Sequence, residues 1–375
     1  MERNTRIAII GAGVGGLTVG GFLQREGFQV TIYEQAQAFS RLGAGITLSP
    51  NVTKVLRRLG ILDTLVQDGI KPNSYISRAW DSGETMHELV FDAASEEEFG
   101  GPFVTIHRGD LHAGMAQGIT PSTVVFNRQL VGLEETGQSV RLVFGNGASA
   151  EADIVIGADG IHSKVREHLF GVEPLRFIGS VAYRSVFPAE KLGGYQMPDC
   201  TKWWGPDRHI LSYFVRSKRD EVNVMGSVPA PAWDIEEPSR PSSIEEMRGA
   251  FEDFHDDLHR VLKSVGEVSV WPIYDRERND RWSSGRVVLL GDACHSMRPY
   301  MGAGGGAAVE DSAILSRCLA TYDNLAEAFS SYEATRIPRV AEAQRISIEN
   351  TWLSRPTDTG WYYCYDACTA PLMKP

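Results

Sequence analysis

Four glycines near the start of the chain have the spacing of a dinucleotide-binding loop. They are Gly11, Gly13, Gly15 and Gly16. The loop follows an apolar run at 7–10, which predicts a strand, and it opens a helical pattern at 17–26. Glycines there permit a tight turn, close approach of backbone to a pyrophosphate, and contact between helix and strand, while the helix N-terminus faces the phosphates. The spacing therefore predicts that this end of the chain holds a dinucleotide.

An acidic residue supports this interpretation. A second apolar run at 30–33 predicts the next strand and ends in Glu34, which is placed to accept a hydrogen bond from a ribose hydroxyl. A glycine turn in an ordinary βαβ unit is the alternative. Strand, helix, second strand and terminal acid all agree with the dinucleotide site.

Two further acid and glycine pairs each follow an apolar run. Asp159-Gly160 comes after the run at 152–156, and Gly291-Asp292 comes after the run at 286–290. Each pair would be a weak signal alone. Their order along the chain predicts a nucleotide-binding domain that is interrupted in sequence and resumed near its end.

A later strand pattern could carry proton chemistry. The alternation in residues 208–215 puts His209 and Tyr213 on the same face of the expected strand. This places a titratable imidazole and a phenol beside one apolar surface. A surface histidine and a core tyrosine are the alternative. On the preceding strand Trp203 and Trp204 must face opposite ways, so we expect one of them to belong to the core.

The elements that must position these residues indicate an α/β fold with two intimately packed domains. Strand and hairpin patterns between about 175 and 270 differ from the nucleotide-fold pattern on either side and indicate a sheet-based lid. We expect a Rossmann-like domain with an inserted substrate domain. The expected nucleotide-binding segments are 1–70, 101–175 and 270–350, the substrate segments are 71–100 and 176–269, and 351–375 is a C-terminal tail.

Composition limits the classes of function. The chain of 375 residues can bury a large core, and its net charge of −11 disfavours binding to nucleic acid or to an anionic membrane. The sequence shows no charged leader and no apolar segment long enough to span a bilayer, so we expect a cytoplasmic protein. The five cysteines lack metal-site spacing, which predicts reduced thiols and no metal site. A monomer and a homodimer both remain open.

Together the motifs resemble those of the single-component FAD-dependent aromatic hydroxylases, the family of para-hydroxybenzoate and salicylate hydroxylases. The segment 159–166 fits the family's middle motif, with Asp159, Ser163 and Arg166 at its defining positions. The segment 291–311 fits the downstream motif. The resemblance covers nearly the whole chain. It implies non-covalent FAD in a Rossmann-like domain with an inserted sheet-based substrate domain, as in para-hydroxybenzoate hydroxylase.

The resemblance also implies which residues contact FAD. Asp292 is implied to bond the ribityl chain, and the glycines after Pro299 to set backbone N–H groups beside the flavin ring. The cofactor-binding set is Gly11, Gly13, Gly15, Gly16, Glu34, Gln35, Arg41, Gly45, Arg108, Asp159, Asp292, Pro299, Gly302, Gly304 and Gly305. Only one dinucleotide fingerprint is present, so NADH or NADPH is expected to dock transiently as a co-substrate.

Within the family, Lys202-Trp203-Trp204 and Asp207-Arg208-His209 resemble a decarboxylative branch that hydroxylates a hydroxypyridine carboxylate. Thr47 and Tyr300 stand where that branch has histidines, so the substrate need not be the same. The substrate-binding residues implied by the resemblance are Thr47, Cys200, Trp203 and Tyr300. For Cys200, a buried structural thiol is an equal alternative.

The expected activity is hydroxylation of a small aromatic or pyridine carboxylate that bears a hydroxyl or amino group, with or without loss of CO₂. The resemblance implies that reduced FAD and O₂ form a flavin C4a-hydroperoxide, which an electron-rich ring attacks. His209 and Tyr213 would accept or relay the proton of the ring hydroxyl. The alternatives are a flavin oxidase or dehydrogenase, which transfers hydride without inserting oxygen, and a flavin-binding redox sensor.

Overall fold

A six-stranded sheet forms one end of the molecule in the computed structural model, which describes residues 1–41, 43–234 and 239–374. The strand order is β18-β19-β11-β1-β2-β7. The strands are β1 (Arg6–Ile10), β2 (Gln29–Tyr33), β7 (Val124–Val125), β11 (Ile154–Gly157), β18 (Ser283–Ser284) and β19 (Val287–Leu289). All pairs from β19 to β7 are parallel, and β18 is antiparallel to β19. The apolar runs of β1 and β11 are buried because a parallel sheet is covered on both faces.

The three glycine motifs meet at one edge of this sheet. Gly11 follows β1, Asp159 follows the neighbouring β11, and Asp292 follows β19, which pairs with β11. The carboxyl ends of adjacent parallel strands share an edge, and ligands of such sheets bind there. Segments far apart in sequence therefore form one nucleotide-binding sheet, as the Rossmann-like prediction required.

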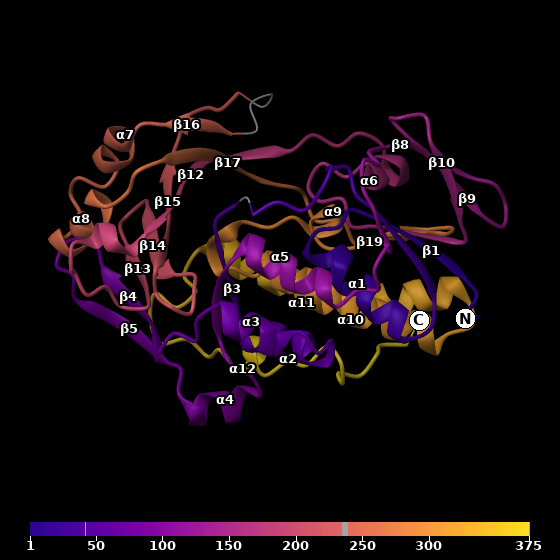
Figure 1. Ribbon diagram of the computed structural model, residues 1–375, viewed down its shortest axis with the longest axis horizontal. Helices are drawn as coiled ribbons and strands as arrows, with labels where there is room; N and C mark the ends of the chain where they lie inside the picture. The colour runs from indigo at the N-terminus through magenta and orange to yellow at the C-terminus, as the bar shows by residue number, and fades with distance from the viewer. Residues whose placement is uncertain (42, 235–238, 375) are drawn as a thin grey trace.

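Long helices pack beside this sheet. α1 (Val14–Arg25) contacts α10 (Gly304–Thr321), which in turn contacts α11 (Leu325–Glu349). Figure 1 shows these helices and α5 (Arg108–Gln117) running through the middle of the molecule. Among the described residues, no helix combines the length and the apolar character needed to cross a bilayer.

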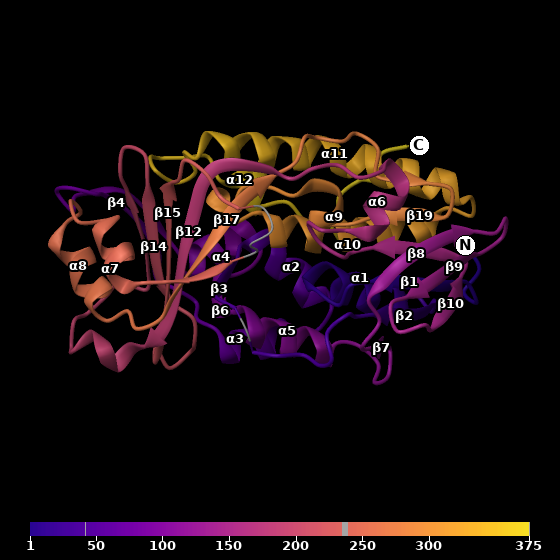
Figure 2. The same ribbon diagram turned by 90° about the horizontal axis from the view of Figure 1, so that it is seen from above.

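An eight-stranded sheet forms the opposite end of the molecule, at the left of Figures 1 and 2, in the order β16-β17-β12-β15-β14-β13-β4-β5. Its strands are β4 (Ser74–Ala79), β5 (Thr85–Val90), β12 (Arg176–Pro188), β13 (Cys200–Trp204), β14 (His209–Phe214), β15 (Glu221–Pro229), β16 (Arg240–Ser242) and β17 (Val268–Asp275). α7 (Ile244–Gly249) and α8 (Asp256–Lys263) cover its outer face over an apolar core that includes Ile210 and Phe251. The inner face is turned toward the rest of the molecule (Figure 2).

Shorter elements lie between and beside the two sheets. Antiparallel pairs join β3 (Gly45–Leu48) to β6 (Val104–His107), and join β9 (Val140–Phe144) to both β8 (Leu130–Glu135) and β10 (Ser149–Ala152). The remaining helices are α2 (Pro50–Arg58), α3 (Leu62–Asp68), α4 (Ala93–Phe99), α6 (Lys164–Phe170), α9 (Asp292–His295), α12 (Gly360–Tyr363) and the 3₁₀ turns η1 (Ala189–Leu192) and η2 (Pro299–Met301). The domain boundaries expected from the sequence stay a prediction.

Candidate active site

The glycines after β1 have separate structural tasks. Gly11 has φ +98°, and a Cβ there would come within 2.9 Å of the carbonyl carbon of Ala158. A Cβ on Gly16 would overlap the carbonyl oxygen of Gly11, so this glycine lets α1 pack on β1. A Cβ on Gly13 would meet nothing within 4 Å. The open space at Gly13, at the N-terminus of α1, fits the approach of a pyrophosphate.

Glu34 holds this loop from the end of β2. Its Oε2 accepts a 2.8 Å hydrogen bond from the backbone N–H of Ala12, and its Oε1 accepts one of 2.8 Å from Ala36. The carboxylate is therefore fixed beside the glycine loop, in the place where a ribose would follow the pyrophosphate. Its neighbour Gln35 is exposed.

The middle and downstream motifs are bonded to each other. Asp159 caps α6: its Oδ1 accepts from the Ser163 hydroxyl at 2.5 Å, and its Oδ2 accepts from the Lys164 N–H at 2.7 Å. In the first turn of α6, the buried Arg166 donates to the carbonyls of Ala293 and Cys294 at 3.3 and 3.2 Å. This contact explains why an arginine belongs to the middle motif, because it fixes the segment that presents Asp292.

Asp292 is the first residue of this segment. Its carboxylate is exposed, and its Oδ1 would lie 3.7 Å from a Cβ on Gly304, at the first turn of α10. Gly305 packs near Ile46 of β3. An acceptor next to the open N-terminus of a helix is a suitable place for the hydroxyls and ring edge of a flavin.

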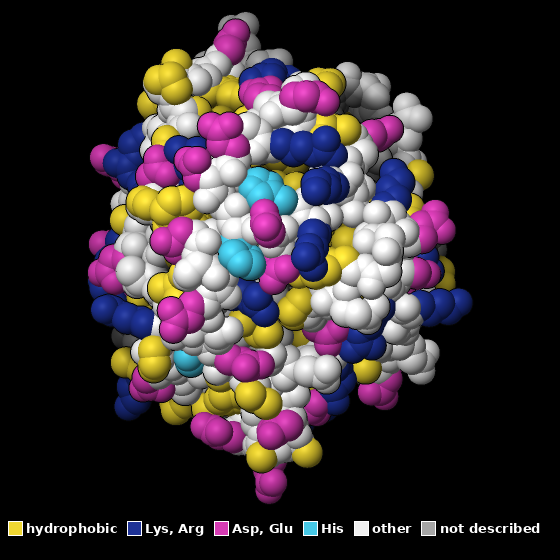
Figure 3. All heavy atoms as spheres, turned by 90° about the vertical axis from the view of Figure 1, so that its left-hand side faces the viewer, with side chains coloured by type: hydrophobic (Ala, Val, Ile, Leu, Met, Phe, Trp, Pro, Cys, Tyr) yellow, Lys and Arg dark blue, Asp and Glu magenta, His cyan; other side chains and the backbone are white. Residues whose placement is uncertain are grey.

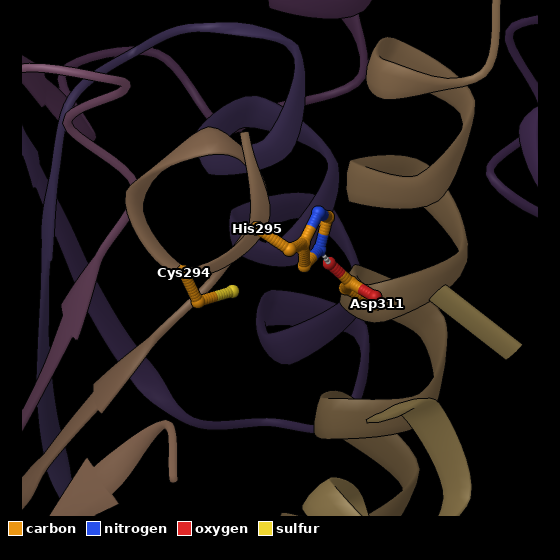
Figure 4. A group of neighbouring side chains, drawn as sticks. All are labelled: Cys294, His295 and Asp311. Atoms are coloured by element: carbon orange, nitrogen blue, oxygen red, sulfur yellow. Dashed lines mark hydrogen bonds and ion pairs between the residues drawn. The ribbon is translucent and has the colours of Figure 1, made fainter. Parts of the chain in front are cut away.

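A buried ion network supports the downstream motif from behind. Asp311 accepts from Arg336 Nε at 2.7 Å and from the Gly291 N–H at 3.2 Å, and it bonds His295 Nε2 at 2.5 Å (Figure 4). Burial would lower the pKa of His295, but Cys294 and Asp311 raise it well above its ordinary value. Donor atoms of Cys294, His295 and Asp311 lie within 4.8 Å of one another. Because Asp311 is already bonded on several sides, we interpret this group as structural support and not as a metal site.

The two arginines assigned to FAD differ in environment. Arg41 is held by Asp110 Oδ1 at 2.8 Å and by Glu221 Oε2 at 2.6 Å, so it ties α5 to the substrate-side strand β15. Arg108 is exposed at the start of α5, and its charge lowers the pKa of Asp292, against burial, which raises it. Arg108 is therefore the better placed of the two for an anionic or polar part of the cofactor.

The inner face of the eight-stranded sheet carries the other candidate residues in three rows. Strand register places Trp204, His209 and Ser227 in the first row, Lys202, Leu211, Met225 and Arg184 in the second, and Cys200, Tyr213 and Asn223 in the third. Leu211 and Met225 stay partly exposed although His209, Ser227, Tyr213 and Asn223 beside them are buried. The middle of the second row is therefore only partly covered, between His209 on one side and Tyr213 on the other.

His209 is buried at the first row. Its ring meets the Tyr300 ring edge-on with centroids 5.0 Å apart, and its Nδ1 lies 3.3 Å from the Asn350 amide nitrogen. Burial, followed by the charge of Lys202, lowers the pKa of His209 well below its ordinary value. The imidazole is thus neutral near pH 7.

Tyr213 and Cys200 pair across strands at the third row. The Tyr213 hydroxyl packs on Gly45, whose N–H donates to Asn223 Oδ1 at 2.7 Å. Burial raises the pKa values of both Tyr213 and Cys200, so both side chains are neutral. Cys200 is fully buried in an apolar cluster with Tyr75 and Tyr213, which agrees with the structural alternative for this thiol.

His209 and Tyr213 do not touch. Four residues along one strand separate them by about 14 Å. Within the described part of the chain no hydrogen bond joins them. A proton therefore cannot pass directly from one to the other.

The loop opposite this face brings Thr47 and Tyr300 to the same space. Gly302 has φ +69°, and a Cβ there would lie 3.1 Å from Thr47 Oγ1. Ser227 Oγ donates to the Tyr300 hydroxyl at 3.3 Å, and Lys202 Nζ donates to the Tyr300 carbonyl at 3.4 Å. Pro299 opens this turn. The assignment of the loop to the flavin face stays a prediction.

The structure corrects the assignment of Trp203 to the substrate-binding residues. It lies on the outer face, buried under α8, where its ring stacks on His255 with centroids 5.8 Å apart. Trp204 lies on the inner face instead, tilted against His209 at 5.6 Å. The alternation of a strand requires this split but does not say which tryptophan faces the site.

Sequence reasoning gave no role to Lys202, Ser227 or Asn350. An inward-facing lysine between Cys200 and Trp204 was the one available signal, because charge on a buried strand face is rare. Ser227 and Asn350 come from ordinary polar positions, and only the packing of distant segments brings them to Tyr300 and His209.

Comparisons with known proteins show the family of the chain. A family model described as "FAD binding domain" matches residues 4–347. The chain is 42% identical over its whole length to 6-hydroxynicotinate 3-monooxygenase from Pseudomonas fluorescens, of which it covers 98%. It is 43% identical to the Bordetella bronchiseptica enzyme of the same name, covering 100% of this chain and 98% of that one. Klebsiella pneumoniae HpxO, solved with FAD and uric acid, superposes with a TM-score of 0.82 and 26% identity over 96% of this chain and 92% of that one.

Proposed function

Because the chain belongs to the family of FAD-dependent aromatic hydroxylases, we propose that it is an NAD(P)H- and O₂-dependent monooxygenase of a hydroxylated aromatic or pyridine carboxylate. The family and the FAD cofactor expected from the sequence are confirmed, and the matches give no support to the oxidase alternative. The exact ring is a proposal. 6-Hydroxynicotinate is the first candidate, since two full-length relatives, 42% and 43% identical to this chain, carry its name.

One observation carries the proposal. The partly exposed Leu211 and Met225 form an apolar floor between a neutral imidazole and a buried phenol, His209 and Tyr213. Across from this floor, Thr47 and Tyr300 line the loop beside the FAD-binding turn. A flat ring that carries a hydroxyl group would fit its ring on the floor and its hydroxyl group against a proton acceptor.

FAD, when bound, supplies the reduction of O₂ and the transfer of one oxygen atom to the ring. The protein's own part is to orient the ring and to take the proton of its hydroxyl. We propose that the proton passes to Nε2 of the neutral His209, where the oxyanion left on the ring offsets the imidazolium charge that burial alone disfavours. This transfer requires the Asn350 amide to be turned so that Nδ1–H donates to its oxygen, which has no other partner among the described residues. Tyr213, with its raised pKa, stays protonated and donates a hydrogen bond.

Thr47 and Tyr300 are proposed to decide which ring fits. They replace histidines of the relatives that the sequence resembles, and the Tyr300 phenol is longer and already bonded to Ser227. Carbon dioxide release depends on whether the ring carbon that receives oxygen carries the carboxylate. This geometry is a property of the bound substrate, so product analysis decides it.

The decisive experiment follows NADH and NADPH oxidation by the purified yellow protein against hydroxypyridine and hydroxybenzoate carboxylates. Product mass and CO₂ are recorded, with ¹⁸O₂ as the oxygen source. The proposal predicts one ¹⁸O atom per product molecule. An oxidised product without ¹⁸O would overturn it in favour of a flavin oxidase or dehydrogenase.

We further propose a cytoplasmic monomer or homodimer without a nucleic-acid partner. The net charge of −11 supports the last point. Light scattering of the purified protein measures its mass in solution.

A further inference from the structure

Lys202 places a buried amine on the inner face of the eight-stranded sheet. The residue is 3% exposed. Its Nζ donates to the Tyr300 carbonyl at 3.4 Å and lies 3.6 Å from the centre of the Trp204 ring. Among the described residues no carboxylate forms an ion pair with this amine. Burial is what lowers the pKa of Lys202.

This environment leaves the amine under-satisfied. A protonated lysine offers three donors, and one long hydrogen bond and one aromatic face use only part of that capacity. An unpaired charge is strongly unfavourable away from water, and leucine or methionine would fill the same place without it. An anion that arrived here would meet a cation with little competition from solvent.

The charges on the outer surface over the eight-stranded sheet are mixed. Figure 3 shows acidic and basic side chains interspersed over the surface that covers the eight-stranded sheet. Lys202 lies beneath that surface, in the second row with the partly exposed Leu211 and Met225. Its position is therefore at the wall of the space where the ring would lie.

We propose that Lys202 binds the carboxylate of the substrate and selects carboxylated rings over neutral ones. The inference rests on the proposed function. Trp204 and His209 pair directly across strands, and Lys202 is two residues before Trp204 on the same face. The carboxylate and the ring hydroxyl would thus be held at neighbouring points, by Lys202 and His209.

Two other interpretations have to be separated from this one. Lys202 could merely anchor the loop at Tyr300, through its bond to the backbone carbonyl. Alternatively Arg184, the other cation of the second row, could hold the carboxylate. Arg184 lies at the far side of Met225, half-buried over Trp271 at 5.2 Å, where burial and Arg108 lower its pKa.

The test compares matched ligands in equilibrium binding without NAD(P)H. FAD-loaded wild type, Lys202→Met and Arg184→Met are titrated with 6-hydroxynicotinate and 6-hydroxynicotinamide, and with 4-hydroxybenzoate and 4-hydroxybenzamide, while the flavin absorbance is followed. A charge-assisted bond predicts that wild type prefers the acid roughly 10- to 100-fold. Lys202→Met should reduce this preference to about threefold or less, and Arg184→Met should keep it. Lys202→Gln serves in the same way if the Met variant does not fold.

The outcomes are distinct. An undiminished preference in the Lys202 variants overturns the inference, and so does loss of the preference in Arg184→Met alone. Equal weakening of acid and amide in Lys202→Met, with weaker FAD binding, would assign Lys202 to anchoring the loop. If wild type binds none of the acids, the proposed function fails together with the inference. Binding of acids without a role for Lys202 leaves the function intact.

Discussion

The amide nitrogen of Asn350 lies 3.3 Å from Nδ1 of His209, so the end of α11 touches the imidazole of the candidate site. Asn350 ends the helix with φ +51°, a left-handed conformation that asparagine tolerates better than most residues. An amide nitrogen can only donate, so in this orientation Nδ1 accepts and Nε2 carries the ring proton. If the amide is turned so that Nδ1–H donates to its oxygen, which has no other partner among the described residues, Nε2 becomes the acceptor for a substrate. Asn350 is therefore a positioning residue for His209.

Replacing His209 by alanine should lower hydroxylation about 10²- to 10⁴-fold, since a proton acceptor is lost. Reduction of the flavin should continue, so NAD(P)H would be consumed with formation of H₂O₂. The quantity to measure is the ratio of product formed to NAD(P)H consumed. Asn350→Leu should lower the same ratio less, because the imidazole remains. Wild-type rate and ratio in His209→Ala would move the proton acceptor to Thr47, Cys200 or Tyr300.

Tyr213→Phe tests the other side of the same space. It removes only the hydroxyl that packs on Gly45, and it should also depress hydroxylation strongly. If both residues serve one proton path through the substrate, the double variant with His209→Ala should be no slower than the slower single variant. Multiplied effects would instead indicate two independent roles and contradict the relay.

Substitutions at two glycines of the first motif should impair different properties, FAD binding at Gly13 and stability at Gly16. Gly13→Val should leave the fold of the FAD-free protein unchanged and abolish FAD binding, because its side chain would fill only the open space at the helix start. Gly16→Ala should destabilise the FAD-free protein by about 1–3 kcal/mol, because its Cβ overlaps the Gly11 carbonyl oxygen. Chemical denaturation and FAD titration separate the two effects. Unimpaired FAD binding by Gly13→Val would show that the pyrophosphate lies elsewhere.

Substitution of Asp292 should affect binding of the cofactor, and substitution of Tyr300 should affect the substrate. Asp292→Ala should weaken FAD binding about 10- to 100-fold, since it removes a charged hydrogen-bond acceptor beside the N-terminus of α10. Tyr300→Phe should leave FAD affinity unchanged and alter substrate-dependent steps, because its hydroxyl bonds Ser227 on the substrate-side sheet. Titration of FAD into both FAD-free variants tests this. Equal loss of affinity would mean that Tyr300 belongs to the cofactor site.

Asp311→Asn should destabilise the FAD-free protein by about 3–5 kcal/mol, because His295 would lose its buried partner and Arg336 would keep only Glu310. Arg336 and His295 help to lower the pKa of Asp311 against burial, so its contribution is lost as the pH falls below about 3.9. The pKa of His295 is raised, so its contribution is full below about 6.5 and declines as the pH rises further. The difference between wild type and variant should be largest between these two values. Denaturation curves at several pH values measure it, and a pH-independent difference would contradict the ion network.

Local patterns in the sequence were sufficient for the cofactor half of the molecule. The glycine loop between a strand and a helix, the acid after β2 and the two later motifs all follow strand ends that share an edge, and together they indicate a dinucleotide site. The period of two likewise put His209 and Tyr213 on one face without any structure. These inferences needed only spacing along a single strand or turn.

The tertiary structure alone decided which face of that sheet is the site and what completes it. The alternation of side chains along a strand requires Trp203 and Trp204 to lie on opposite faces of the sheet. It does not say which face is the outer one, because that depends on where α7 and α8 pack. The meeting of Lys202, Tyr300 and Asn350 around His209 joins positions up to 148 residues apart, as 202 and 350 are, and arises from docking the sheet against the loop and the end of α11. Contacts of that kind depend on how whole surfaces pack, and no local pattern in the chain encodes them.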